Sequence, residues 1–320
     1  MSDTMVSLRQ QIDRAGDLQS VVRTMKALAA SNIVQYEKSV NALADYYHTV
    51  ELGLGVCFRE NFKPAPNGKE AVIPVKQKGK ESADSIGAVV FGSDQGLVGR
   101  FNDLIADYAV QKLASLPGKP HVWAVGERVH ARLEDSGLQI EGLFSVPNSV
   151  KAITPLIGQI LVESEAFNSR KENAELYLFY NRPKSRAVYA PVSQRLLPLD
   201  EIWQREIMEL PWPTGSLPEV IGNNIGTLQA LIREYLFVSL FRACAESLAS
   251  ENSSRLAAMQ RADRNIDEML EDLQGKYYRL RQSGIDEELF EVVSGFEALS
   301  ESSRQKGNAA QKWQYGENKK

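Results

Sequence analysis

Residues 91 to 103, FGSDQGLVGRFND, combine glycines with a Ser-Asp pair and a following helical pattern. A glycine turn that opens a helix can present backbone amides to a phosphate, so this loop is the first candidate for chemistry. Its spacing argues against that chemistry. The glycines lie at 92, 96 and 99, which fits neither GxGxxG nor GxxxxGK[ST], and Arg100 stands where a phosphate-binding loop has lysine. The pattern therefore favours a structural or contact loop over a nucleotide site.

The remaining reactive residue types are scattered. His48, His121 and His130 have no cysteine or carboxylate at ligand spacing, and Cys57 and Cys244 are isolated from each other. This distribution is typical of neither a metal site nor a redox pair. The chain also lacks the GxSxG and HExxH motifs. We therefore expect no catalytic residue, no bound metal and no cofactor.

Charge and hydropathy exclude two further classes. The formal net charge is -4, which supplies no basic field for nucleic acid. No stretch of about 18 residues is free of charge, so no transmembrane helix is expected. The sequence predicts a cytosolic protein or one that associates peripherally with a membrane.

Both ends of the chain carry the periodicity of long helices. From Ser7 to about Cys57 there is no proline, and apolar residues recur at alternating intervals of three and four. The same spacing returns after Pro218 and continues to about Leu299. A helix of roughly eighty residues would be about 120 Å long. This pattern predicts two terminal helices that pair as an antiparallel coiled coil.

The region between these helices reads as an α/β domain. Short runs rich in β-branched and aromatic residues, such as SIGAVVFGS and AELYLFYN, predict strands. Amphipathic segments at 101–116, 127–136 and 150–167 lie between the first runs, which indicates βαβ units and a mainly parallel sheet. We therefore expect a Rossmann-like domain inserted between the helices. The predicted boundaries are 1–60 for the first helix, 61–84 for a connector, 85–200 for the α/β domain, 201–216 for a second connector, 217–299 for the second helix and 300–320 for a polar tail.

Three motifs carry a resemblance to a known family. Residues 239 to 299, with ASENSSRLAAM followed by RQSGIDEEL and VSGF, closely resemble the C-terminal helix of the gamma subunit of F-type ATP synthases. TMKALAAS at 24–31 resembles that family's N-terminal Met-Lys motif. SDQGLVGRFN at 93–102 resembles its S-D-x-G-L-x-G-x-F-N loop. The three motifs occur in the expected order and span nearly the entire chain.

The resemblance implies a central rotating shaft that is not itself an enzyme. In that family the shaft turns inside a ring of three alpha and three beta subunits, and catalysis belongs to the beta subunits. Its expected partners are the alpha and beta subunits, the epsilon subunit and the membrane c-ring, with no nucleic acid and no small-molecule substrate. The expected location is the cytoplasmic face of the bacterial inner membrane, held peripherally. The coupling ion and the direction of the reaction cannot be read from this chain.

The resemblance also assigns contact residues. The catch and bearing residues that meet the ring are expected to be Met25, Lys26, Arg281, Gln282, Asp286, Glu288, Val292, Val293 and Phe296. The contact loop is expected to comprise Ser93, Asp94, Gly96, Leu97, Gly99, Phe101 and Asn102. A simpler alternative exists for the helical residues, because a coiled-coil seam would explain the apolar ones and a solvated helix face would explain the polar ones. For Glu251 and Arg255, four residues apart, an ion pair on one helix face is the alternative to a partner contact.

Several departures from the family pattern bear on these assignments. Asp286 stands where the family often has threonine, and two aspartates precede the Met-Lys pair where basic residues are usual. The chain also continues after Leu299 as a polar tail, which we expect to be disordered or to form a short extension. These departures favour a divergent bacterial branch, with the alternate N-type, sodium-linked ATPases as a candidate. A non-rotary coiled-coil adaptor with a globular insert remains the alternative function, although it leaves the three motifs unexplained.

Overall fold

The computed structural model describes residues 4–61, 85–170, 174–185, 188–216, 218–220 and 224–316. It divides into two compact units. One comprises Met1–Arg23 with Arg261–Lys320, and the other comprises Thr24–Gln260. The predicted connector at 61–84 lies almost wholly outside the described residues. The first unit is helical, and the second contains a sheet with helices on both of its faces.

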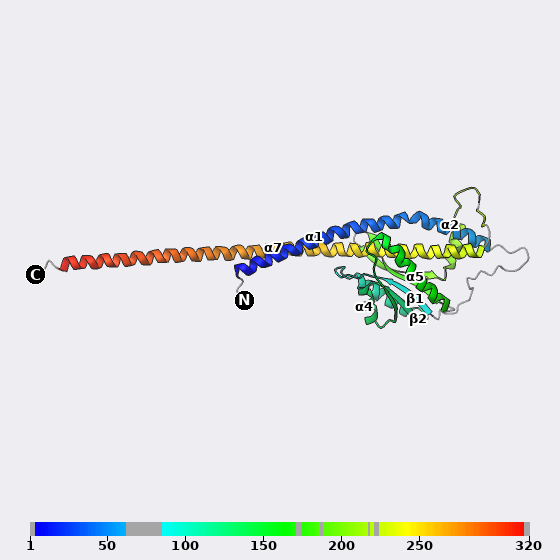
Figure 1. Cartoon of the computed structure of the whole chain (residues 1–320), viewed down its shortest axis with the longest axis horizontal. Helices are drawn as coiled ribbons and strands as arrows, with labels where there is room; N and C mark the ends of the chain where they lie inside the picture. Colours follow the sequence, from blue (N-terminus) through cyan, green and yellow to red (C-terminus); the bar gives the residue numbers. More distant parts are fainter. Residues whose placement is uncertain are drawn as a thin grey trace, which may run out of the picture. The chain divides into compact units, whose positions relative to one another are not determined.

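The terminal segments form long helices, with limits that differ from those expected. The predicted N-terminal helix is interrupted at Leu43, so that α1 spans Met5–Ala42 and α2 spans Ala44–Asn61. At the other end, α7 spans Asn224–Gly316 (Figure 1). The helix therefore continues through most of the segment after residue 299, where we expected either a disordered tail or a short extension. No proline or left-handed glycine interrupts α7, and the run SESSRQKGNAAQKW contains many residues that helices accept.

Polar contacts within each unit show that α1 and α2 run antiparallel to α7. In the first unit, Gln19 and Arg23 of α1 bond to Asp267 and Asp263 of α7. In the second unit, Asn32 bonds to Asn252, and Tyr46 of α2 bonds to Glu234. The partner's number falls as the residue number of α1 or α2 rises. The predicted antiparallel pairing is confirmed.

The buried positions of α1 follow a seven-residue repeat. Its most buried apolar side chains are Leu8, Ala15, Val22, Ala29 and Tyr36. A seven-residue interval keeps successive side chains on the same face of a helix that packs against another helix. Small alanines at two of these positions allow the backbones to approach closely. The coiled-coil stripe read from the sequence is therefore present, although narrower than predicted.

The second unit contains one five-stranded sheet in the order β3-β2-β1-β4-β5. The first four strands are parallel, and β5 is antiparallel to β4. The strand β3 was not predicted, because its residues IEGLF form a short edge strand that is only half buried. The strands are Ser85–Phe91 (β1), Lys119–Val125 (β2), Ile140–Phe144 (β3), Ala174–Ser185 (β4) and Val188–Leu197 (β5).

Helices cover both faces of this sheet. The three predicted helices are found as α3 (Phe101–Ala114), α4 (Glu127–Asp135) and α5 (Val150–Arg170). On one face, α3 and α4 pack against alternate residues of β1 and β2. On the other face, α5, α2 and the first part of α7 enclose the larger core, and Figure 1 shows α4 and α5 on opposite sides of the sheet. A further helix, α6 (Glu201–Glu209), lies within the segment 201–216 that was expected to be a connector.

Candidate partner-contact site

The loop after β1 is organised around Gly92 and Ser93. A Cβ atom at residue 92 would come within 2.3 Å of the Val129 Cβ, so only glycine allows β1 to end this close to α4. The backbone amide of Ser93 donates to Asn102 Oδ1 at 3.0 Å, and Asn102 Nδ2 donates to Ser93 Oγ at 2.8 Å. The two ends of the contact loop are thus joined by a reciprocal pair of hydrogen bonds. This explains why the motif needs serine and asparagine nine residues apart.

The carboxylate of Asp94 links this loop to two other segments. Its Oδ1 accepts from the backbone amide of Glu127 at 3.0 Å, and its Oδ2 accepts from the amide of Val146 at 2.9 Å. A carboxylate at the start of a helix also interacts favourably with the positive end of the helix dipole. In the same place, Gly126 has φ 117°, and the backbone of Ser93 lies 2.8 Å from where its Cβ would be. Asp94 therefore holds together the loop, the start of α4 and the segment after β3.

The tip of the loop presents Leu97. Leu97 has φ 64°, a left-handed conformation that is costly for a bulky residue, and its side chain is 59% exposed. The following Val98 is buried, and its carbonyl oxygen accepts a hydrogen bond from Ser254 of α7. Gly99 then takes φ 57° before α3 begins. A strained backbone at an exposed apolar residue makes Leu97 a candidate contact residue.

A helix of the same chain lies against the end of the sheet where open α/β folds often bind a ligand. The chain leaves β1 for one face of the sheet and reaches β4 from the other, and crevices at such switch points hold nucleotides in open α/β folds. In this chain, Ser250 of α7 donates a hydrogen bond to the carbonyl oxygen of Asn181 in β4, and Asn181 Nδ2 donates to the carbonyl oxygen of Phe101. α7 is therefore hydrogen-bonded to the strand that borders this switch point. The contact-loop interpretation of residues 93–102 stays a prediction.

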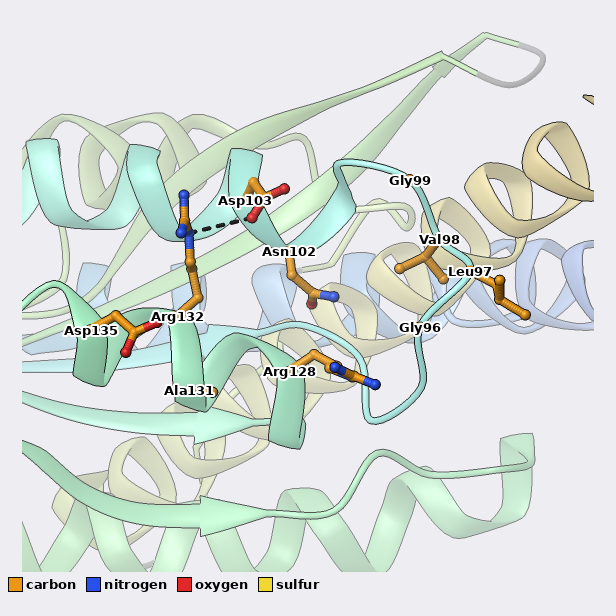
Figure 2. A pocket seen from close by; sticks show the side chains of 10 residues that line it. All are labelled: Gly96, Leu97, Val98, Gly99, Asn102, Asp103, Arg128, Ala131, Arg132 and Asp135. Carbon is orange, nitrogen blue, oxygen red and sulfur yellow. Dashed lines mark ion pairs between the residues drawn. The ribbon is translucent and has the colours of Figure 1, made fainter.

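A hollow of about 350 Å³ lies beside the loop, between Gly96–Gly99 and one side of α4. Figure 2 shows Arg128 directed toward the loop and Leu97 pointing away from it at the tip. Across the hollow, Arg132 Nε lies 3.3 Å from Asp103 Oδ1. Its lining mixes both charge signs with glycine and apolar atoms. It could receive a side chain of a partner, and it shows no preference for an anion.

The structure corrects one expectation about the histidines. The nearest Nδ1-to-carboxylate distances are 3.9 Å for His48 and Glu51, 2.6 Å for His121 and Glu141 and 3.4 Å for His130 and Glu134. Each histidine thus lies beside one glutamate, because helical turns and neighbouring strands bring the pairs together. Even so, the described residues contain no group of three or more His, Cys, Asp or Glu side chains that could hold a metal ion.

The predicted catch and bearing residues fall into two places. Met25 and Lys26 lie half buried on α1 in the second unit. The remaining residues lie on α7 in the first unit, and all of them are exposed: Arg281, Gln282, Asp286, Glu288, Val292, Val293 and Phe296. Met25, Lys26 and the contact loop belong to the second unit, whereas the predicted contact residues of α7 belong to the first.

The apolar stripe of α7 changes from covered to uncovered within the first unit. Ile266 is 5% exposed, whereas Ile285 is 54%, Val292 70% and Phe296 74% exposed. The antiparallel register that pairs Arg23 with Asp263 runs out of α1 residues before Ile285 is reached. An exposed apolar stripe of this kind is a candidate interaction surface.

The pair formed by Glu251 and Arg255 is buried rather than exposed. Glu251 Oε1 lies 2.6 Å from Arg255 Nη2, and the side chains are 6% and 12% exposed. The predicted ion pair is therefore confirmed. Burial raises the pKa of the Glu251 carboxyl, and the positive charge of Arg255 opposes that rise. This ion pair therefore lies on a buried face of α7 in the second unit and is not exposed for a partner contact.

The polar residues that join α7 to the sheet were not predicted from the sequence. Glu246, Ser250 and Ser254 lie one helical turn apart and bond to Arg182, Asn181 and Val98. The only signal was the run SLASENSS, in which small polar residues interrupt an otherwise apolar helix. Small polar side chains in a buried stretch of helix indicate hydrogen-bonded packing against another element.

The fold defines the class of protein: two long helical segments that pair antiparallel, with an inserted α/β domain. Within the described part of the chain, no helix combines the length and apolar character needed to cross a bilayer.

The comparisons with known proteins identify the family. The family model described as ATP synthase matches residues 4–299. The ATP synthase gamma chain of Salinibacter ruber is 27% identical over 92% of this chain and 98% of its own length. That of Rhizobium johnstonii is 29% identical over 92% and 99%. The chain therefore belongs to the ATP synthase family, among the gamma chains, which are non-catalytic subunits of the central rotor stalk.

Solved structures support the same fold. A chain in the OSCP/F1/c-ring structure of the Euglena gracilis mitochondrial ATP synthase has a TM-score of 0.60 with 14% identity, and the match covers 92% of this chain and 94% of that chain. A central-stalk chain from Tetrahymena thermophila has a TM-score of 0.53 with 20% identity and covers 76% and 99%. The predicted family and fold class are confirmed. Membrane association of a gamma chain is peripheral, through the complex to which it belongs.

Proposed function

We propose that this chain turns inside a ring of alpha and beta subunits and meets the ring at three surfaces. These are the contact loop around Leu97, the segment of α1 at Met25 and Lys26, and the exposed part of α7 from Arg281 to Phe296. The foot of the shaft stands on a membrane c-ring beside an epsilon subunit. The location is the cytoplasmic face of a bacterial inner membrane.

The observation that carries this proposal is the uncovered stripe of α7. Ile285, Val292 and Phe296 continue the spacing of the buried Ile266, yet each is more than half exposed. Exposing such a stripe to water is unfavourable by about 25 cal/mol per Å² of apolar surface. The stripe is therefore expected to be covered when the protein works. A sleeve formed by a surrounding ring would cover a helix on all sides while letting it turn.

Polar residues on the same helix supply the angle-dependent part of the interaction. Arg281 and Gln282 are exposed on α7 and can donate charge-assisted hydrogen bonds to acceptors of a beta subunit. Because one helix has different side chains on its different sides, each beta subunit meets a different surface at each rotation angle. Each angle then favours a different beta conformation through differential contacts.

The test is co-expression of the full chain with its host's alpha and beta subunits, followed by purification and ATP hydrolysis assays with and without the chain. We expect one copy of the chain per three alpha-beta pairs and steady turnover that depends on it. A ring that forms and turns over equally well without the chain would overturn the proposal. The non-rotary coiled-coil adaptor would then become the leading account.

A further inference from the structure

The row of polar residues on α7 suggests how the α/β domain and the shaft are held in rotation together. Glu246, Ser250 and Ser254 occupy one face of α7 at intervals of four residues. Each bonds to a different part of the α/β domain: Arg182 in β4, the carbonyl oxygen of Asn181, and the carbonyl oxygen of Val98 in the contact loop. The row therefore attaches to both the sheet and the loop.

Glu246 makes the strongest of these contacts. Its Oε2 accepts from Arg182 Nε at 3.0 Å, and its Oε1 accepts from Arg242 Nε at 2.8 Å. The Glu246 side chain is 8% exposed, whereas Arg182 and Arg242 are 44% and 47% exposed. A buried carboxylate is strongly destabilised when a cationic partner is removed, so this arrangement is expected to persist.

Arg182 is itself held in position. Its Nη2 donates to the hydroxyl of Tyr180, and its guanidinium lies 5.4 Å from the centroid of that ring. Tyr180 is 1% exposed in the core of the second unit. The contacts with Tyr180 therefore restrain the orientation of the Arg182 side chain relative to the sheet. Charge-assisted hydrogen bonds are directional, whereas apolar packing is not, so this contact resists sliding that packing alone would permit.

We propose that the Arg182–Glu246 bond, supported by Ser250 and Ser254, is the attachment through which the α/β domain transmits torque to α7. This inference rests on the proposed rotor function. Arg182 and Glu246 are positioning residues in it, because they act on the partner subunits only through the shaft. The contact loop is tied to the same face of α7 through Ser254, so the loop turns in register with the helix.

The chain offers a matched control in Arg242. Arg182 and Arg242 bind the same carboxylate, but Arg242 lies on α7 itself, one turn before Glu246, so its hydrogen bond to Glu246 stays within the helix. Arg182→Met removes the bond between domain and helix, whereas Arg242→Met removes a bond within the helix. Both changes take one cation from Glu246. Arg182→Lys keeps a positively charged hydrogen-bond donor on β4 that can bind Glu246.

The first measurement uses the full chain alone. Spin labels at Lys112→Cys on α3 and Ala230→Cys on α7, in a background with Cys57→Ala and Cys244→Ala, report the distance between domain and helix by pulsed electron paramagnetic resonance. We expect Arg182→Met to raise the population of displaced conformations about tenfold, as loss of a hydrogen bond to a charged group allows. Arg242→Met should leave the distribution narrow, and Arg182→Lys should largely restore it. Equal broadening by both methionine variants, or none by either, would overturn the attachment.

The second measurement uses the complete membrane complex and compares ATP hydrolysis with ATP-driven ion transport. We expect Arg182→Met to lower ions transported per ATP while hydrolysis stays near that of the parent, with Arg242→Met unchanged in both. Unchanged coupling in an Arg182→Met complex, despite a broadened distance distribution, would refute the torque role. Failure of the parent chain to join the ring would instead refute the rotor function, while the distance measurement would still decide the attachment.

Discussion

Arg255 Nη2 lies 2.6 Å from Glu251 Oε1, one turn along α7, and both side chains are almost fully buried. Removing the cation would leave a carboxylate without its charge partner in the interior of the second unit. We expect Arg255→Met to lower the free energy of unfolding by about 3–5 kcal/mol, as measured by urea unfolding near neutral pH. A loss no larger than that of Arg279→Met, at an exposed position of the same helix, would contradict this expectation.

Glu251 should also make stability depend on pH. Burial raises its pKa in the folded chain above the ordinary value of 4.5, so the folded state binds this proton more tightly than the unfolded state does. Below pH 4.5 the carboxyl is protonated in both states and has no such effect. As pH rises from 4.5 through the raised pKa, the unfolded state ionises first and stability falls.

The variant Glu251→Gln isolates this effect. We expect the fall in the free energy of unfolding above pH 4.5 to become shallower than in the parent chain. Urea unfolding at a series of pH values measures the difference, with Glu291→Gln at an exposed position as the control. If the free energy of unfolding falls equally with pH in Glu251→Gln and in the parent chain, a titrating group other than Glu251 causes the fall.

Gly92 should be irreplaceable for a steric reason. A Cβ atom there would meet Val129 Cβ at 2.3 Å, so Gly92→Ala must push β1 and α4 apart. We expect a loss of about 2–3 kcal/mol in thermal or urea unfolding. The control is Gly96→Ala in the same loop, where the nearest atom is Arg128 Nη2 at 3.8 Å. Equal losses of stability at both positions would mean that the conformational freedom of glycine in the loop, and not the steric clash with Val129, causes the effect.

The native Leu97 is expected to lower the stability of the chain while contributing to turnover of the complex. Its φ of 64° suits glycine, so Leu97→Gly is expected to raise the free energy of unfolding by about 1 kcal/mol. If the exposed side chain contacts the ring, the same variant should lower turnover of the assembled complex. Leu97→Ala keeps the backbone strain and should lower turnover without the gain in stability. Full turnover in both variants would remove Leu97 from the contact surface.

The proposed contact of Arg281 and Gln282 with a beta subunit is tested by replacing both residues with alanine. Both are exposed, so the chain should stay folded, while turnover in the complex should fall about tenfold through loss of charge-assisted hydrogen bonds. Arg279→Ala removes a cation on the opposite side of the helix from Arg281, so it should lower turnover less than the double replacement. Circular dichroism checks the fold and steady-state hydrolysis checks the contact. Unchanged turnover would refute the assignment of these two residues.

Local patterns were sufficient for much of the fold. Helical periodicity identified both terminal helices, because the three-and-four spacing of apolar residues depends only on helix geometry. The alternation of apolar runs and amphipathic segments identified β1, β2, β4 and the helices α3 to α5. The break at Leu43 was missed because the periodic pattern continues across it, and the end of α7 was missed because the tail is polar without being unfavourable for a helix.

The helices, the α/β insert and the loop motif could all be predicted from the amino-acid pattern, because each depends on neighbouring residues. Which distant groups form hydrogen bonds with each other depends on the folded chain. Asp94 accepts from the amide of Val146, Arg182 bonds to Glu246, and Ser254 bonds to the carbonyl oxygen of Val98. These partners are far apart in sequence, and their meeting depends on strand order and on the path of α7 past the sheet. No local periodicity encodes that path, so the hydrogen bonds between the α/β domain and α7 could not be predicted from the sequence.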